Sequence, residues 1–358
     1  MKDEPVVVPG RGRIAGFDGL RAIAVAATIS THLGHKWADG VTMFFVLSGF
    51  LITGLLMNSG DRSVWRFWGR RVLRLYPALV LYLIAVAAFG VLGWATVPWE
   101  ALVAGGFYLT NYAPFPALAR ETSHLWSLAV EEQFYVLWPL VMVWGRRIAL
   151  PLAIAGVCAS WWWRTYPPAD LNHYVDRYFL PAADAILIGC ILALLVCARP
   201  GHRVVRAVAH TPVTLVVSIA AIAAPLLSDS LWIDANYLEI QRLAIALLLL
   251  WVCGNQRSWP VRLLEVQPIL YLGTISYGIY LWQGLFVRNG PIDPVIVLHE
   301  WPWNVLATVA AATLSYELVE RRFLRLKDRF RPRPAEPRGT ERTSGGIGST
   351  PEPRPPTT

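Results

Sequence analysis

Long apolar runs recur along nearly the whole sequence, and they limit the folds that it can adopt. Of its 358 residues, 55% are hydrophobic and 16% are charged, and the mean hydropathy is +0.43. Soluble domains average about a quarter charged residues, so this composition argues against a soluble enzyme. The runs are about 17 to 25 residues long, which is the length that an α-helix needs to cross a bilayer. The sequence therefore predicts an all-α fold, a polytopic membrane helical bundle.

The apolar runs predict about ten transmembrane helices, and residues 98–113 form one weaker candidate. Counting that run as a span would reverse the side of every later loop. Without it, the basic segments all fall on one side, which the positive-inside rule assigns to the cytoplasm. We therefore predict cytoplasmic N- and C-termini, with 98–113 as an interfacial or re-entrant element on the outer side. The predicted spans are 17–35, 41–59, 75–94, 124–144, 147–163, 178–198, 211–228, 238–253, 269–288 and 303–319.

Residues 331–358 differ in composition from the rest of the chain. They are rich in proline, glycine and charge and lack apolar periodicity, which predicts a disordered cytoplasmic tail. We assign residues 1–330 to one integral membrane domain, so any chemistry must take place inside the helical bundle. The polar N-terminus precedes an apolar run without an A-x-A-like cleavage site, so we expect the first span to be retained.

Neither a metal site nor a nucleic-acid site is predicted. The four cysteines lie within apolar runs and lack the spacing of a metal site, so we expect core residues rather than ligands or disulfides. The formal net charge is +8, but the arginines lie beside the predicted spans. Membrane orientation therefore explains the charge better than binding of nucleic acid does.

The first predicted span carries several ionisable side chains, among them Arg21 and His32, whereas His35 lies close to its outer end and is expected to be peripheral. Such groups are costly at membrane depth unless they are paired or face water, so each marks a candidate functional site. Arg21 and His32 are eleven residues apart, which places them on one helix face, about 16 Å apart along the axis. An imidazole exchanges protons near physiological pH, so we interpret His32 as a catalytic base rather than a hydrogen-bonded core histidine. Arg21 is either functional or a snorkelling interfacial residue, and the sequence does not separate these readings.

Two adjacent carboxylates, Glu131 and Glu132, lie in the predicted span 124–144. On a helix they point about 100° apart. Either one can be the ion-pair partner of an intramembrane arginine, and one of them can instead orient His32 or hold a substrate hydroxyl. The residues themselves leave both readings open.

A basic cluster, Arg70, Arg71 and Arg74, precedes the predicted span 75–94. It is an orientation signal for the membrane. Three guanidinium groups within about one helical turn also form a surface that binds phosphate, and Arg70 and Arg74 lie on nearly the same helix face. Both readings can hold at once.

Six short motifs follow one another between about residues 14 and 325. They are FDGLRAIAV with Arg21 and His32 in R-x10-H spacing, FFVLSGFLI at 44–52, RRVLRLYP at 70–77, WSLAVEEQFY at 126–135, LGTISYGIYLW at 272–282 and LSYELVE at 314–320. In content and order they resemble the membrane-bound acyltransferase 3 family. The resemblance implies a bundle of about ten helices that transfers an acyl group, commonly acetyl, from cytoplasmic acyl-CoA to a hydroxyl, usually of a carbohydrate.

The resemblance also implies roles for individual residues. Arg21 and His32 correspond to the pair regarded as essential, Glu131 to the motif glutamate and Glu320 to the glutamate of the last helix. Two positions depart from the family pattern. Gln283 stands where a histidine is frequent, which puts an acid-base group there in doubt, and Arg322 stands where proline is usual, which extends the basic end of the chain.

These observations predict an O-acyltransferase of the cell membrane with acyl-CoA, expected to be acetyl-CoA, as co-substrate and no metal. Arg70, Arg71 and Arg74 are expected to hold the phosphates of the donor, together with Arg21. His32 would be the general base for the acceptor hydroxyl, with Glu131 orienting it or balancing its charge. Such a base contributes about 10²- to 10⁴-fold to a rate.

The expected partners are acyl-CoA, a carbohydrate or glycosylated acceptor, and the lipid bilayer. The oxyanion of the reaction also needs a hydrogen-bond donor, for which the sequence offers four unranked candidates: Ser48, Tyr135, Ser276 and Tyr277. The alternative function is a transporter or exporter of a glycan or lipid-linked substrate, whose intramembrane charges would carry protons or substrate. Against it, the sequence shows no inverted repeat, and its ionic groups concentrate in the first half.

Overall fold

The computed structural model describes residues 5–35, 39–58, 63–112, 114, 119–166, 177–227, 231–287 and 300–328. All regular secondary structure within these ranges is helical, which confirms the predicted all-α class. The predicted tail at 331–358 lies outside the described residues.

The helices follow the predicted apolar runs closely. In chain order they are α1 (Phe17–His32), α2 (Gly40–Asn58), α3 (Val64–Val91), α4 (Trp99–Gly106), α6 (Arg120–Ser123), α7 (Trp126–Trp144), α8 (Ala149–Thr165), α9 (Phe179–Ala198), α10 (Arg203–His210), α11 (Pro212–Leu227), α12 (Leu231–Gly254), α13 (Trp259–Leu264), α14 (Gln267–Thr274), α15 (Ser276–Phe286), α16 (Trp303–Ser315), the π-helical turn η3 (Tyr316–Glu320) and α17 (Arg321–Asp328).

Two predicted boundaries need correction. The run expected to start at residue 75 belongs to a helix that already begins at Val64, where the side chain of Ser63 accepts a hydrogen bond from the backbone N–H of Arg66 at 3.4 Å. The basic cluster therefore lies within α3 rather than before it. The run expected over 269–288 is divided at Ile275 into α14 and α15.

Several described helices are long and apolar enough to cross a membrane, as is typical of a membrane protein. They are α2, α3, α9 and residues 237–254 of α12, and the pair α10 and α11, bent by 66°, provides a fifth. The helices α1, α8 and α16 have 16, 17 and 13 residues. At 1.5 Å per residue they are about 20 to 26 Å long, less than the roughly 30 Å of a hydrocarbon core. The ten-span topology therefore stays a prediction.

The weaker run at 98–113 forms only the eight-residue helix α4 and a turn that folds back on the bundle. Eight residues rise about 12 Å, which is too short to cross the membrane. The hydroxyl of Tyr76 on α3 donates to the carbonyl of Gly106 at 3.0 Å, and the amide of Gln133 on α7 donates to the carbonyl of Tyr108 at 2.8 Å. This geometry agrees with an interfacial or re-entrant element.

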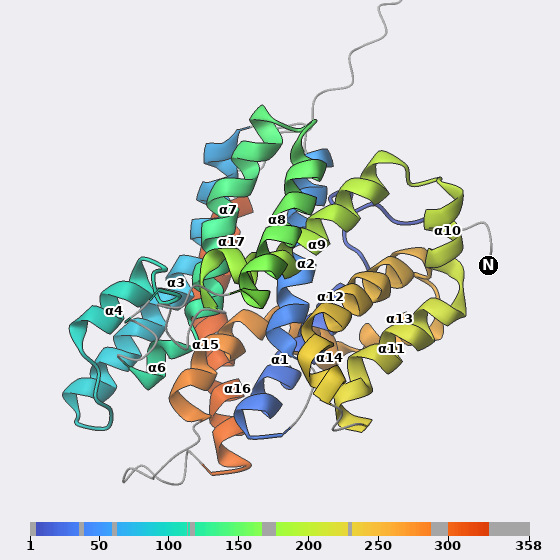
Figure 1. The fold of residues 1–358 in the computed structure, drawn as a ribbon. Helices are drawn as coiled ribbons and strands as arrows, with labels where there is room; N and C mark the ends of the chain where they lie inside the picture. The colour runs from blue at the N-terminus through green and yellow to red at the C-terminus, as the bar shows by residue number, and fades with distance from the viewer. Residues whose placement is uncertain are drawn as a thin grey trace, which may run out of the picture.

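Helix α1 lies near the centre of the bundle, between a group formed by α3, α4 and α6 and a group formed by α10 to α14 (Figure 1). It packs against α2, α14 and α15. Arg21 and His32 lie near opposite ends of α1 and line different cavities.

The closest helix packing joins α2 to α9 through two glycines. A Cβ atom on Gly49 would overlap the carbonyl oxygen of Ile186, and one on Gly189 would overlap the carbonyl oxygen of Val46. Small residues at such points allow helix backbones to pack tightly in membranes. This contact also fixes the position of Ser48, which directly precedes Gly49.

Gly49→Ala is expected to destabilise the fold by about 1–3 kcal/mol, because the new methyl group meets backbone rather than a flexible side chain. Thermal unfolding in detergent would measure the effect. Gly69→Ala is the matched control, since nothing lies within 4 Å of its Cβ position on α3, and alanine favours a helix by roughly 0.5–1 kcal/mol over glycine. Equal unfolding temperatures for the two variants would contradict this account of the α2–α9 contact.

Candidate active site

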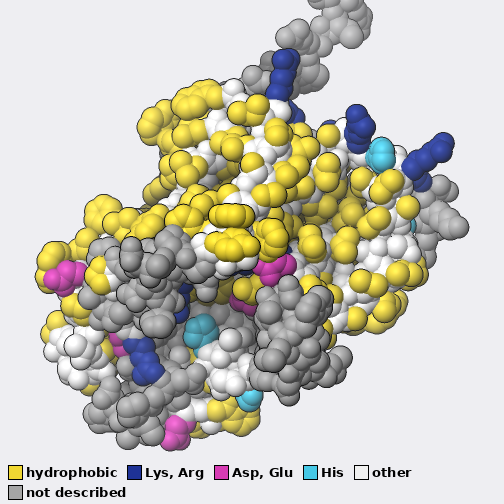
Figure 2. Space-filling model, viewed as in Figure 1, with side chains coloured by type: hydrophobic (Ala, Val, Ile, Leu, Met, Phe, Trp, Pro, Cys, Tyr) yellow, Lys and Arg dark blue, Asp and Glu magenta, His cyan; other side chains and the backbone are white. Residues whose placement is uncertain are grey.

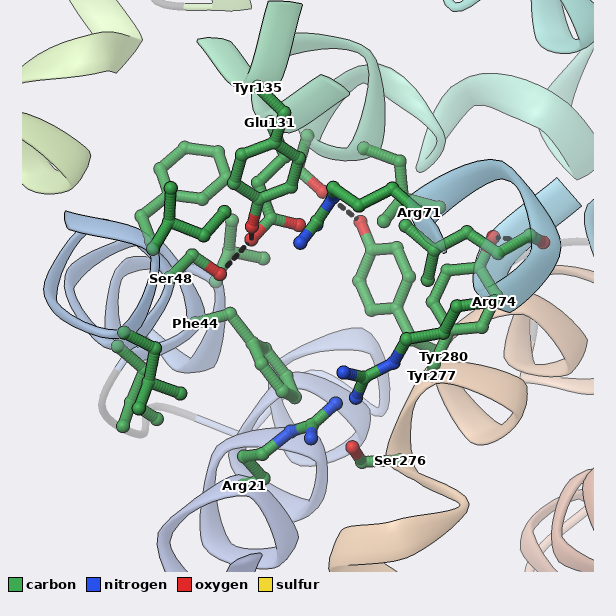
Figure 3. A pocket seen from close by; sticks show the side chains of 18 of the residues that line it. Arg21, Phe44, Ser48, Arg71, Arg74, Glu131, Tyr135, Ser276, Tyr277 and Tyr280 are labelled. Carbon is green, nitrogen blue, oxygen red and sulfur yellow. Dashed lines mark hydrogen bonds between the residues drawn. The ribbon is translucent and has the colours of Figure 1, made fainter. Parts of the chain in front are cut away.

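A cavity of about 200 Å³ lies where α1, α2, α3, α7 and α15 meet (Figure 3). Its wall combines apolar side chains with guanidinium, carboxylate and hydroxyl groups. We call it the arginine cavity, and its polar lining consists of Arg21, Ser48, Arg71, Arg74, Ser127, Glu131, Tyr135, Ser276, Tyr277 and Tyr280.

Arg21 from α1 and Arg74 from α3 point into the same region of the arginine cavity, near Ser276 (Figure 3). Both also line a neighbouring cavity of about 150 Å³, whose acidic members are Asp18 and Glu320. Two guanidinium groups that face one space repel each other, and an anion between them would relieve that repulsion. Of the two readings of Arg21, its position here favours the functional one.

Arg71 and Glu132 form an ion pair, with Nη2 and Oε1 3.4 Å apart. The guanidinium of Arg71 also lies over the ring of Tyr135, 3.2 Å from the ring centroid. Glu132 therefore has the first of the two roles considered for the carboxylates, that of an ion-pair partner for an intramembrane arginine. Arg71 is held in the cavity wall by both contacts.

Glu131 accepts hydrogen bonds from two hydroxyl groups, that of Ser48 and that of Tyr135, the latter at 2.7 Å. Figure 3 shows the three side chains converging on one side of the arginine cavity. His32 lines a different cavity. The structure thus does not bring Glu131 and His32 together, and the expected orienting contact between them is not present.

Arg70 is separated from Arg71 and Arg74. It lines a cavity of about 650 Å³ together with Arg146 and Arg147, which connect α7 to α8. We call this cavity the basic vestibule. Leu55 lines both the vestibule and the arginine cavity, so the two adjoin at that residue. The predicted arginine cluster is therefore divided between two adjacent cavities.

The cavity that contains His32 has a volume of about 160 Å³ and lies between the C-terminal end of α1, α6 and α15. We call it the histidine cavity, and its lining consists of His32, Arg120, Ser123, His124, Gln283, Gly284 and Val287. In Figure 2 the molecular face is hollowed near the positions of α1, α6 and α15, and a histidine side chain is visible in that hollow.

The His32 ring makes a hydrogen bond through its Nδ1 with the carbonyl oxygen of Thr28, at 2.8 Å. A carbonyl oxygen only accepts, so Nδ1 is the protonated nitrogen. In the neutral ring Nε2 then carries the lone pair, as a general base requires. Half-buried His32 is therefore prepared to accept a proton through Nε2.

The arginine and histidine cavities are separated by a small group of hydrogen-bonded residues. The hydroxyl of Tyr280 donates to the carbonyl of His124 at 2.6 Å and lies 2.6 Å from the hydroxyl of Ser127. Tyr280 and Ser127 line the arginine cavity, whereas the ring of His124 lines the histidine cavity. We call these three residues the dividing wall.

The four candidate oxyanion donors all line the arginine cavity, but their hydrogen bonds distinguish them. Ser48 and Tyr135 donate to Glu131, and Tyr277 donates to the carbonyl of Leu75 at 3.1 Å. Buried Ser276 has no hydrogen-bond partner for its hydroxyl within the described part of the chain. Ser276 is therefore the candidate whose proton is available to a substrate.

Sequence reasoning overlooked His124 and Tyr280. His124 is the first residue of the predicted span 124–144, so a histidine at the edge of an apolar run was the signal that could have identified it. Tyr280 carried no such signal, because a tyrosine in an apolar helix is an ordinary core residue.

Comparison with known proteins gives one family and several relatives. A family described as an acyltransferase domain matches residues 14–319. YrhL of Bacillus subtilis is 30% identical over 350 residues, which cover 86% of this chain. The peptidoglycan O-acetyltransferase OatA of Listeria monocytogenes is 27% identical over 349 residues, 87% of this chain. The O-acetyltransferase OatA of Staphylococcus aureus is 27% identical over 373 residues, 86% of this chain.

The chain spans slightly more than half the length of these relatives, with 54% of YrhL and 56% of each OatA covered. No solved structure matches it. The matched family region contains Arg21, His32, the α3 arginines and the carboxylates of α7, and it covers most of the chain. On this match the protein belongs to the acyltransferase 3 family.

Proposed function

We propose that the protein is a multi-pass O-acyltransferase of the cell membrane. It transfers an acyl group, with acetyl as the expected group, from acyl-CoA to a hydroxyl of a carbohydrate. The observation that carries this proposal is the adjacency of a cavity lined by arginines and a cavity that presents the free Nε2 of His32. The names of YrhL and of the Listeria OatA, both of which include peptidoglycan, make it the leading acceptor.

The proposed orientation places both chain ends in the cytoplasm and uses all ten predicted spans. Arg70, Arg146 and Arg147 then lie on the cytoplasmic side, so the basic vestibule opens toward the acyl-CoA pool. His32, at the other end of α1, lies about 16 Å from Arg21 along the helix axis. The histidine cavity accordingly faces the outer side, where a cell-wall glycan is found.

The donor would bind across the two adjoining cavities. Its phosphates meet Arg70, with Arg146 and Arg147, in the basic vestibule. The pantetheine arm passes Leu55 into the arginine cavity, whose wall is largely apolar. In this cavity Arg74 and Arg21 meet the phosphate closest to the arm, and Arg71, bound to Glu132, shapes the passage.

The reaction follows from this arrangement. The acceptor oxygen attacks the thioester carbonyl while His32 Nε2 removes its proton. The C–O bond forms as an oxyanion develops on the former carbonyl oxygen, and the C–S bond then breaks as the carbonyl re-forms. The proton on His32 passes to the departing thiolate of CoA. Because Tyr280 closes the dividing wall, the thioester reaches His32 only after the Tyr280 hydroxyl leaves the carbonyl of His124.

Purified protein in liposomes, supplied with acetyl-CoA labelled in its acetyl group and a soluble peptidoglycan fragment, tests the proposal. We expect the label to appear as an ester on the glycan and one CoA thiol to be released per ester formed. A transporter or exporter would move the glycan without releasing CoA thiol. Absence of both thiol release and glycan ester would refute the proposed reaction.

A further inference from the structure

Two buried polar side chains in the histidine cavity have no hydrogen-bond partner within the described part of the chain. Gln283 is 1% exposed, and neither its amide nitrogen nor its amide oxygen is paired. His124 is 5% exposed, and neither ring nitrogen makes a hydrogen bond of acceptable geometry. Buried polar groups are rarely left unpaired in native proteins, so each requires an explanation. A ligand that occupies the cavity would supply the missing partners.

The chemistry of these groups indicates what such a ligand must offer. An amide and an imidazole can each donate and accept a hydrogen bond, and so can a hydroxyl group. Among the described residues that line the cavity there is no carboxylate, and their one guanidinium is that of exposed Arg120. The volume of about 160 Å³ corresponds to roughly five water molecules at about 30 Å³ each. The lining therefore suits one face of a single polyhydroxylated ring.

His124 is fixed in position for such a contact. Its ring packs edge to face against Tyr82, 5.7 Å between centroids, and at a tilt of 58° against Tyr280, 5.4 Å between centroids. A Cβ atom on Gly284 would overlap the His124 ring, so only glycine leaves room for it there. These contacts hold the unpaired imidazole rigidly beside His32, which lowers the entropic cost of binding a ligand.

We propose that the histidine cavity is the acceptor-binding site, where Gln283 and His124 hydrogen-bond a pyranose ring next to its reacting hydroxyl. The reacting hydroxyl faces Nε2 of His32, and the neighbouring polar groups of the sugar pair with the amide and the second imidazole. The assignment of the bound sugar as an acyl acceptor rests on the proposed function, whereas its binding does not. Gln283 thus takes the binding role, and a histidine at this position would have the same capacity to donate and accept a hydrogen bond.

Direct binding in the absence of any acyl donor tests this site. The probe is the soluble disaccharide of N-acetylglucosamine and N-acetylmuramic acid, measured by saturation-transfer NMR with the detergent-purified full chain. Gln283→Leu and, separately, His124→Phe are expected to weaken binding at least tenfold, because each leaves sugar hydroxyls facing an apolar group. Gln283→His, which restores a donor and an acceptor, should stay within about threefold of the wild type.

Gln133→Leu is the matched control. Gln133 is an amide on α7 outside all the cavities, and it bonds to the Tyr108 carbonyl and to Asn111. Its loss should lower thermal stability without changing the affinity for the disaccharide. Equal binding by Gln283→Leu and Gln133→Leu, or no binding by the wild type, would overturn the proposal. Intact binding without acetyl transfer from acetyl-CoA would instead refute the proposed function and leave the binding site in place.

Discussion

Replacing His32 with alanine is expected to lower the rate of acyl transfer about 10²- to 10⁴-fold, the usual contribution of a general base. The physical reason is the tautomer of the ring. The hydrogen bond to the Thr28 carbonyl keeps the proton on Nδ1, so Nε2 is left as the proton acceptor. The affinity for acyl-CoA should not change, because His32 does not line the arginine cavity. Transfer to the glycan at saturating donor measures the first quantity, and equilibrium binding of acetyl-CoA measures the second.

His35→Ala provides the control for the His32 variant. His35 is exposed, follows α1 and lines none of the cavities described above, so its loss should leave the transfer rate near that of the wild type. His32→Gln adds a second comparison, since its amide can donate to the Thr28 carbonyl but cannot act as a base. A folded His32→Ala protein that transfers acyl groups at the wild-type rate would remove the assignment of His32 as the base.

Most of the helical architecture could be predicted because a span in a bilayer must be a continuous apolar run, and such runs are visible in the sequence. The errors arose where a local feature decides the boundary. The side chain of Ser63 starts α3 earlier than its apolar run begins, and the interruption at Ile275 divides one run into two helices. Neither feature changes the average hydrophobicity of the roughly 17 to 25 surrounding residues, so the apolar runs alone could not predict it.

The candidate site was predictable in composition but not in arrangement. Arg21 and Glu131 were selected as ionisable groups in predicted spans and Arg74 as part of a basic cluster before one, and the structure brings all three into one cavity. The separate location of His32 depends on the packing of α6 and α15 against α1, which unites residues far apart in the sequence. A contact between helices that are far apart in the sequence leaves no pattern in the residues of any one helix.

The α3 arginines show that the sequence also failed to predict the arrangement of residues that are close together in the chain. Arg70 and Arg74 are four residues apart, which places them about 40° apart around the helix but about 6 Å apart along its axis. The helical-wheel argument treated them as one surface. The axial offset is enough to leave Arg70 in the basic vestibule and Arg74 in the arginine cavity.

The Arg70→Ala/Arg74→Ala double variant is expected to weaken acetyl-CoA binding about 10²- to 10⁴-fold. Each substitution removes a charge-assisted hydrogen bond to phosphate, worth about 1.5–3 kcal/mol, and a tenfold change in affinity corresponds to about 1.4 kcal/mol. The two arginines occupy different cavities and would contact different parts of the donor, so their effects should be nearly additive. Equilibrium binding to the purified protein would measure both single variants and the double variant.

The control for this series is Arg199→Ala/Arg203→Ala, which removes the same charge from exposed positions around the start of α10. It should leave the affinity for acetyl-CoA within about twofold, because an exposed charge acts on a distant anion only through a screened field. An equal loss in both double variants would indicate a general electrostatic effect rather than a binding site. Unchanged affinity in the Arg70/Arg74 variant would leave these arginines as orientation signals alone, since a donor that crosses both cavities must contact at least one of them.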